Sequence, residues 1–212
     1  RKRLALHGRD IFSKTVEMAE YAREEINAIG GYYAYSRELI NGDSIYDFDI
    51  SKLSIFTLPI GLAGIEVYDL LRDEYDIQIE FGDIGNILAY ISVGDRNRDI
   101  ERLISALSEI KRRFGKTESG LLTQEYINPI VAETPRNAFY GGKRSLPLDE
   151  AAGCVCSEFV MCYPPGIPIL APGELITDEI IKYIKYAKEK GWDKEAGLDV
   201  EIKYFNSGAD IL

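Results

Sequence analysis

In the first 115 positions, the spacing of the hydrophobic residues changes several times between that of a helix and that of a strand. Residues 65–75 and 100–114 carry apolar side chains three and four positions apart, as one face of a helix requires. Residues 52–58 and 77–81 carry them at alternate positions, and residues 87–93 are apolar on both faces. The order strand, helix, strand, strand, helix predicts an α/β (α+β) fold, a two-layer α/β sandwich on a small mixed sheet.

A long amphipathic helix is predicted before this sandwich. Its apolar stripe has helical spacing and ends at Gly30-Gly31; it consists of Phe12, Val16, Ala19, Ala22, Ile26 and Ile29. The aromatic segment Tyr32–Tyr35 follows as a short strand candidate. The helix therefore leads directly into the sheet.

Clear periodicity is lost after the second sandwich helix. Residues 116–146 contain mostly turn residues and predict a connecting segment. Beyond it we expect one helical turn over 147–152, a strand over 154–162, a stiff proline-rich loop over 163–168, and a helix that Thr177 caps and that ends at Gly191. These elements predict a second, C-terminal α/β subdomain.

The composition excludes several classes of protein. The chain has 212 residues, is 46% hydrophobic and carries a formal net charge of −10. An acidic chain is a poor partner for nucleic acid, and no apolar run reaches the roughly 18 residues of a membrane span. Three cysteines, Cys154, Cys156 and Cys162, form neither a disulfide framework nor a zinc pattern, and Cys154 and Cys156 are expected to pack in a core. We expect a soluble, cytoplasmic protein.

Few residues suggest chemistry by themselves. His7 is the only histidine and has no identifiable partner, so a structural or surface role is favoured. Gly61–Gly64 and Gly82–Gly85 lack the lysine and the three-glycine spacing of nucleotide-binding loops, which favours turns. The acidic positions in 43–49 lack the glycine and terminal glutamate of a calcium loop, and we interpret them as a solvated turn. No metal site is predicted.

Several motifs together resemble one family. The C-terminal half contains, in order, TPRNAFY (134–140), LPLDEAAG (146–153), SEFV (157–160), YPPGIP (163–168) and APGE (171–174). Earlier segments agree: YDFD (46–49) with Lys52-Leu53, GLAGIE (61–66) and LLRDEY (70–75). The chain thus resembles the C-terminal part of the ornithine/lysine/arginine decarboxylases, which use pyridoxal phosphate on the aspartate-aminotransferase type of fold.

The resemblance implies a particular place for this chain in a larger enzyme. In the family, a large N-terminal domain supplies the Schiff-base lysine, the acidic partner of the pyridine nitrogen and the phosphate cup. The resemblance therefore places residues 1–30 in the last helix of that domain, residues 31–116 in the small α/β domain and residues 117–212 in the C-terminal subdomain. It implies no catalytic and no cofactor-binding residue in this chain, which alone is expected to be inactive.

The resemblance also implies a substrate and an assembly. Compact family members with this C-terminal region resemble arginine decarboxylases, which convert arginine to agmatine and carbon dioxide in polyamine synthesis. Glu158 is the candidate substrate-binding residue, because a carboxylate beside a stiff loop can pair with the distal cation of a basic amino acid. A homo-oligomer, a dimer or higher, is implied for the full-length enzyme.

Other interpretations stay open at this point. The substrate could be lysine or ornithine, and the parent enzyme could perform a different transformation of basic amino acids on the same scaffold. The chain could also be a stand-alone, non-catalytic module that binds a partner. The apolar stripe of the first helix, including Phe12, would then need cover from the sandwich or from outside the chain.

Overall fold

The computed structural model describes residues 1–116, 127–162, 166–189 and 201–205 of the chain. The chain forms two compact units, Arg1–Thr123 and Gln124–Leu212, and each is described by itself. The predicted division at residues 30 and 116 stays a prediction.

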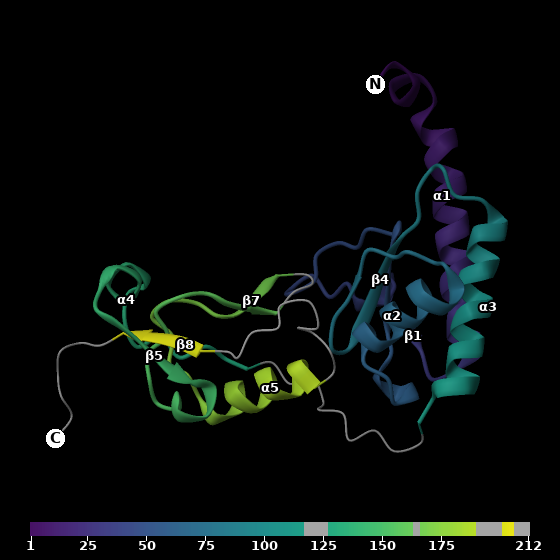
Figure 1. The fold of residues 1–212 in the computed structure, drawn as a ribbon. Helices are drawn as coiled ribbons and strands as arrows, with labels where there is room; N and C mark the ends of the chain where they lie inside the picture. Colours follow the sequence, from purple (N-terminus) through teal and green to yellow (C-terminus); the bar gives the residue numbers. More distant parts are fainter. Residues whose placement is uncertain (117–126, 163–165, 190–200, 206–212) are drawn as a thin grey trace. The chain divides into compact units, whose positions relative to one another are not determined.

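The first unit contains three long helices and a four-stranded sheet (Figure 1). Its elements are α1 (Lys2–Ile29), β1 (Tyr33–Ala34), η1 (Arg37–Leu39), β2 (Lys52–Phe56), η2 (Leu58–Ile60), α2 (Gly64–Tyr75), β3 (Phe81–Gly82), β4 (Asn86–Tyr90) and α3 (Asn97–Phe114). The helices predicted over 65–75 and 100–114 are confirmed, and Gly115 is the C-cap of α3 as the pattern indicates.

One hydrophobic core joins the helices to one face of the sheet. The sheet contributes alternate residues of β2 and β4, including Leu53, Ile55, Ile87 and Ala89, which are at most 5% exposed. The same cluster contains buried side chains of all three helices. This arrangement confirms the two-layer α/β sandwich.

The prediction of a mixed sheet is wrong, because every pair of neighbouring strands is antiparallel. The strand order is β1-β2-β4-β3. Strands β2 and β3 run in the same direction and are joined through α2, as a strand-helix-strand pattern suggests. Strand β4 returns from β3 through a tight turn and lies between them, so the two parallel strands are never neighbours.

The strand predicted over 77–81 is mostly absent because its first residue helps to end α2. Asp76 adopts a left-handed conformation, with φ of 53°, and the amide of Ile77 donates to the carbonyl of Leu71 at 2.9 Å. This bond, together with the bond from the Asp76 amide to the same carbonyl, ends α2 and turns the chain away from the helix. Only Phe81 and Gly82 pair with β4, although the Glu80 amide also donates to Leu88.

The long helix α1 is confirmed, but its burial begins later than the stripe predicts. Phe12 is 45% exposed, whereas Ala19, Ala22 and Ile26 are completely buried against the sandwich. The first half of α1 also exposes the apolar residues Leu4 and Leu6. The contact of α1 with α3 and the sheet thus belongs to its C-terminal half.

The second unit contains two pairs of short strands and, beside them, the helix α5 (Figure 1). Its elements are α4 (Pro135–Tyr140), β5 (Lys143–Pro147), η3 (Leu148–Glu150), β6 (Val160–Cys162), β7 (Ile167–Leu170), α5 (Asp178–Glu189) and β8 (Glu201–Phe205). Strands β5 and β8 form one antiparallel pair, and β6 and β7 form another. A separate core gathers Leu148, Ala151, Cys156, Leu170, Ile176, Ile180, Ile181 and Ile184.

Two sequence predictions for this unit need correction. The connecting segment over 116–146 contains α4 and β5, which are too short to show periodicity. The strand over 154–162 is interrupted: Val155 and Cys156 form isolated bridges, and only Val160–Cys162 is a strand. The helical turn after Pro147 is confirmed, as is the start of the helix that Thr177 caps, where the Thr177 hydroxyl accepts from the Ile180 amide. The predicted end of this helix at Gly191 and residues 163–165 of the predicted proline-rich loop lie outside the described residues.

No helix within the described ranges is both long and apolar enough to cross a bilayer.

Candidate substrate-contact site

Glu158 lies on a loop that the core of the second unit anchors. The preceding Cys156 is completely buried, and its thiol donates to the carbonyl of Glu158 at 2.9 Å. The amide of Cys156 donates to the carbonyl of Glu174, and the amide of Gly173 donates to the carbonyl of Cys156, both at 2.8 Å. These bonds fix the backbone from Cys156 to Glu158, which carries the Glu158 side chain.

The carboxylate of Glu158 contacts the ammonium of Lys143. Nζ of Lys143 lies 3.2 Å from Oε1 of Glu158 and 4.3 Å from the ring centroid of Phe139. The Glu158 side chain is 39% exposed and that of Lys143 is 25% exposed. A carboxylate and an aromatic face thus hold the alkylammonium group of Lys143, and both are types of group that bind organic cations.

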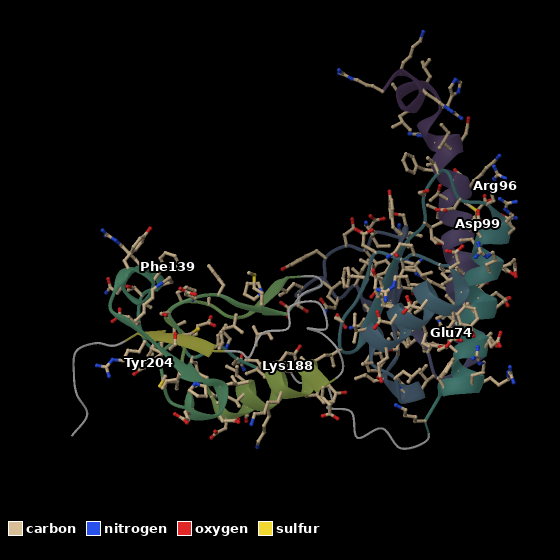
Figure 2. All side chains as sticks on the ribbon, in the orientation of Figure 1. Glu74, Arg96, Asp99, Phe139, Lys188 and Tyr204 are labelled. Atoms are coloured by element: carbon tan, nitrogen blue, oxygen red, sulfur yellow. The ribbon has the colours of Figure 1, made fainter. Side chains whose placement is uncertain are left out.

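Three segments bring these groups together. Phe139 is on α4, Lys143 begins β5, and Glu158 follows the bridge between Cys156 and Tyr204 of β8. Figure 2 labels Phe139 and Tyr204 in this unit. The sequence proposed Glu158 as a site residue but did not indicate its contact with Lys143 or the contact of Lys143 with Phe139. One feature of the sequence indicates the helix that carries Phe139. Thr134 before Pro135 is typical of a helix start, and in the structure the Thr134 hydroxyl accepts from the Asn137 amide.

The motif residues around Glu174 hold the loop that precedes α4. The Glu174 carboxylate accepts from the Ala171 amide at 2.8 Å, and the carbonyl of Gly173 accepts from the amides of Ala132 and Glu133. Gly173 has a φ of +95°, and a Cβ there would lie 2.3 Å from the Glu133 carbonyl oxygen. This motif is therefore structural and supports the position of α4.

Cys156 and Ser157 are both completely buried beside Glu158. Burial raises the pKa of the Cys156 thiol above its ordinary value, although hydrogen bonds to the backbone of Glu158 and Ser157 oppose the shift. Cys154 and Cys156 both belong to the surroundings of this core, as the sequence indicates. Within the described residues the Ser157 hydroxyl has no hydrogen-bond partner.

The two glycine-containing segments of the first unit form a packed junction. At the start of α2, the amides of Gly64 and Ile65 donate to the carbonyls of Ile84 and Asp83, at 3.1 and 2.8 Å. A phosphate at a helix N-terminus needs these amides for itself. The segments therefore do not fit the phosphate of pyridoxal phosphate, and the preference for turns agrees with the structure.

The acidic segment 43–49 forms a solvated turn. The carbonyl oxygen of the Asn41 side chain accepts three backbone amides, and the Asp49 carboxylate accepts the amide and hydroxyl of Ser51. The bond from the Ser51 hydroxyl lowers the pKa of Asp49. In the described part of the chain, no three His, Cys, Asp or Glu side chains gather closely enough to hold a metal ion. His7 is exposed on α1.

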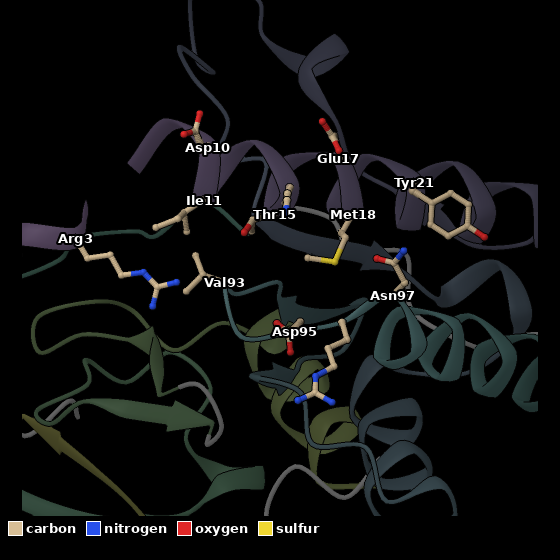
Figure 3. A pocket seen from close by; sticks show the side chains of 12 residues that line it. Arg3, Asp10, Ile11, Thr15, Glu17, Met18, Tyr21, Val93, Asp95 and Asn97 are labelled. Atoms are coloured by element: carbon tan, nitrogen blue, oxygen red, sulfur yellow. The ribbon is translucent and has the colours of Figure 1, made fainter. Parts of the chain in front are cut away.

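A cavity of about 790 Å³ in the first unit lies between α1 and the loop before α3 (Figure 3). Met18 and Val93 contribute apolar surface, and Asp10, Glu17 and Asp95 contribute carboxylates. Basic side chains line it as well, so its charges are mixed. None of the residues that the sequence proposes for a site lies here.

A family model described as Orn/Lys/Arg decarboxylase, C-terminal domain, matches residues 122–205. The chain belongs to the C-terminal region of this family. The motifs around Glu158 and Glu174 lie within the matched decarboxylase domain.

Curated relatives extend the similarity of this decarboxylase region to nearly the whole chain. The chain is 40% identical to the arginine decarboxylase of Bacillus subtilis over 187 residues, which are 87% of this chain and 38% of that protein. It is 39% identical to the arginine decarboxylase of Halalkalibacterium halodurans over 204 residues, which are 95% of this chain and 40% of that protein. The chain thus spans about two fifths of the length of these relatives.

Solved structures share the fold of the decarboxylase region. The lysine decarboxylase of Francisella novicida matches with a TM-score of 0.64 and 19% identity, over 94% of this chain and 40% of that one. The constitutive lysine decarboxylase of Escherichia coli matches with a TM-score of 0.58 and 18% identity, over 87% and 37%. These likenesses confirm the fold class.

Proposed function

We propose that this chain is the C-terminal part of a decarboxylase that converts arginine to agmatine and carbon dioxide. The observation that carries the proposal is the similarity to arginine decarboxylases at 39–40% identity along at least 87% of the chain. Similarity to the constitutive lysine decarboxylase of Escherichia coli is lower, at 27% identity over 59% of the chain. Arginine is therefore favoured over lysine and ornithine.

The cofactor of the proposed enzyme is pyridoxal phosphate, held by a part of the enzyme outside this chain. When bound, that cofactor supplies the electron sink for loss of the carboxylate. The glycine segments described above do not fit its phosphate, so no step of the reaction is assigned to them. The role proposed for this chain is to bind the far end of the substrate.

Glu158 is the residue proposed to bind that far end. Its carboxylate is partly exposed, lies on an anchored loop and already holds an alkylammonium group at 3.2 Å. A guanidinium can replace that ammonium and form two parallel N–H···O bonds with the carboxylate, whereas an ammonium approaches it as a point charge. This difference supports arginine as the substrate.

The test uses a longer protein that contains this chain. Carbon dioxide release is measured with arginine, lysine and ornithine, and bound cofactor is detected by the visible absorbance of its lysine Schiff base. We expect arginine to have the highest kcat/KM, and the 212-residue chain alone to be inactive. A longer protein that binds the cofactor but releases carbon dioxide from none of the three would contradict the proposal.

The residue assignment is tested in the same protein by Glu158→Gln. Loss of a charged hydrogen-bond partner is expected to raise KM for arginine about tenfold or more, with a smaller effect on kcat. Glu150→Gln is the matched control, because Glu150 is an exposed glutamate of the same unit. An unchanged KM in Glu158→Gln would contradict the role of Glu158 without affecting the assigned reaction.

We also propose that the full-length protein is a homo-oligomer and that the exposed half of α1 is covered there. Leu4, Leu6 and Phe12 are 49%, 65% and 45% exposed, a density of apolar surface that favours burial against other protein. Sedimentation analysis of the longer protein and of this chain tests the idea. A monomeric longer protein would contradict the oligomer.

A further inference from the structure

The ammonium of Lys143 occupies the position in which Glu158 would bind a ligand cation. It lies 3.2 Å from the carboxylate and 4.3 Å from the centroid of the Phe139 ring. Both partners are groups that bind free organic cations, a carboxylate by charge-assisted hydrogen bonds and a ring by its negative face. The chain therefore fills this site with one of its own side chains.

The frame of the site is fixed, while its occupant is on a flexible stem. Residue 143 is paired to residue 205 in the β5–β8 ladder, and the loop before Glu158 is held by the bonds of Cys156. Lysine carries its charge on a four-carbon stem with rotatable bonds. The ammonium can leave the carboxylate without any change in the backbone of β5.

We propose that Lys143 is an internal competitor for Glu158: a substrate cation binds the Glu158 carboxylate by displacing the Lys143 ammonium. This inference rests on the proposed function of Glu158 as the contact for the far end of the substrate. It adds an affinity-determining residue, Lys143, which in the absence of ligand keeps the carboxylate paired. The ligand class is a monoalkylguanidinium or alkylammonium cation.

The exposure of the pair sets the strength of this competition. Because both side chains are partly open to water, the ion pair is worth little, and displacement is expected to weaken ligand binding only about two- to fivefold. A buried pair would exclude a ligand almost completely. Here the competitor is weak enough to yield to substrate.

The experiment measures binding of methylguanidinium chloride to the 212-residue chain by NMR titration at constant ionic strength. The variants are Lys143→Met, Glu158→Gln and the double variant, and circular dichroism verifies that each is folded. We expect Lys143→Met to bind the probe about two- to fivefold more tightly than the wild type. We expect the double variant to lose this gain, because the carboxylate is gone.

Lys185→Met is the matched control for the change in net charge. Lys185 is a lysine of the same unit that pairs with Asp149, and its pair has no aromatic partner within the described contacts. Its replacement removes one positive charge without opening Glu158. An equal gain in affinity from Lys185→Met would overturn the inference, because the effect would then be general electrostatics.

The remaining outcomes separate the inference from the proposed function. If Glu158→Gln weakens binding but Lys143→Met does not strengthen it, Lys143 is not a competitor and Glu158 keeps its proposed role. If Glu158→Gln binds the probe as the wild type does, Glu158 is not the cation site and both ideas are overturned.

Discussion

The carbonyl oxygen of Asn86 occupies the space that a side chain at Gly64 would need. A Cβ built on Gly64 would lie 1.9 Å from that oxygen and 2.7 Å from the carbonyl oxygen of Asp83. Both neighbours are backbone atoms, one in the turn after β3 and one in the first residue of β4, so neither can rotate away. The start of α2 approaches the sheet this closely only because residue 64 has no side chain.

Gly64→Ala is therefore expected to destabilise the first unit. Overpacking against a fixed backbone costs about 1 to 3 kcal/mol. We expect a cost at the upper end of that range, because two backbone oxygens lie within contact distance of the added Cβ. Urea unfolding followed by circular dichroism measures the loss, and hydrogen exchange of the α2 amides assigns it to this unit. Gly8→Ala is the control: a Cβ there meets nothing within 4 Å, and alanine favours the helix. Equal stability of the two variants would contradict the prediction.

The buried guanidinium of Arg23 joins α1 to strand β2 and to the residue that follows β1. It is 4% exposed and donates to the carbonyls of Tyr35, Lys52 and Ala19 at 2.8, 2.7 and 3.1 Å. Arg23→Met keeps the apolar stem but leaves these carbonyls without their donor. We expect a loss of about 2 to 4 kcal/mol in the free energy of unfolding, measured by urea denaturation.

The control for Arg23→Met is Arg98→Met. The side chain of Arg98 is 73% exposed and, in the described part of the chain, forms an ion pair with the neighbouring Asp99, so its loss is expected to cost less than about 0.5 kcal/mol. A loss of similar size in both variants would show that Arg23 contributes charge alone and not its three hydrogen bonds.

The fold was predictable where a pattern extends over many residues of one element. The stripe of α3 recurs over about four turns and its end at Gly115 has a local cause, so both could be read from the sequence. The position of β4 between β2 and β3 depends on contacts between distant segments, which residue spacing does not contain. The alternation over 77–81 predicted a longer strand than the structure has, because the amide of Ile77 bonds to the carbonyl of Leu71 at the end of α2.

The candidate site was predictable only in part, for a related reason. Glu158 stands in a family motif, and its residue type alone suggests a cation partner. Its actual partner Lys143 is 15 positions away and reaches it because β5 pairs with β8 and β8 bridges to Cys156. No local pattern marks that path, so the lysine could not be found from sequence.

The pH dependence of stability is expected to reflect Asp83. Burial raises the pKa of this carboxyl above its ordinary value, while hydrogen bonds from the amides of Asn86 and Gly85 oppose the shift. Between the unfolded pKa of about 3.9 and the higher folded pKa, the folded state binds more protons than the unfolded state. Stability from this group therefore falls as pH rises through that window and is constant above it.

Asp83→Asn isolates this contribution. Its side-chain oxygen can still accept the same amides but does not ionise, so its stability relative to the wild type should rise from about pH 4 upward and then level off. Urea unfolding at a series of pH values measures the difference. Asp83→Ala, which removes the acceptor, should be less stable than the wild type at every pH. A constant difference between Asp83→Asn and the wild type would contradict the raised pKa.

Two glycines of the second unit separate the cost of backbone strain from the cost of a clash. Gly153 and Gly173 both have positive φ, +81° and +95°, so alanine costs about 1 to 2 kcal/mol at either position. At Gly153 a Cβ meets nothing within 4 Å, whereas at Gly173 it would lie 2.3 Å from the carbonyl oxygen of Glu133. Gly173→Ala should thus be the less stable variant by about 1 kcal/mol or more in urea. Because Gly173 also holds the loop before α4, hydrogen exchange at the α4 amides should increase in Gly173→Ala and not in Gly153→Ala. Increased exchange in both variants would show that backbone strain, and not the clash, loosens α4.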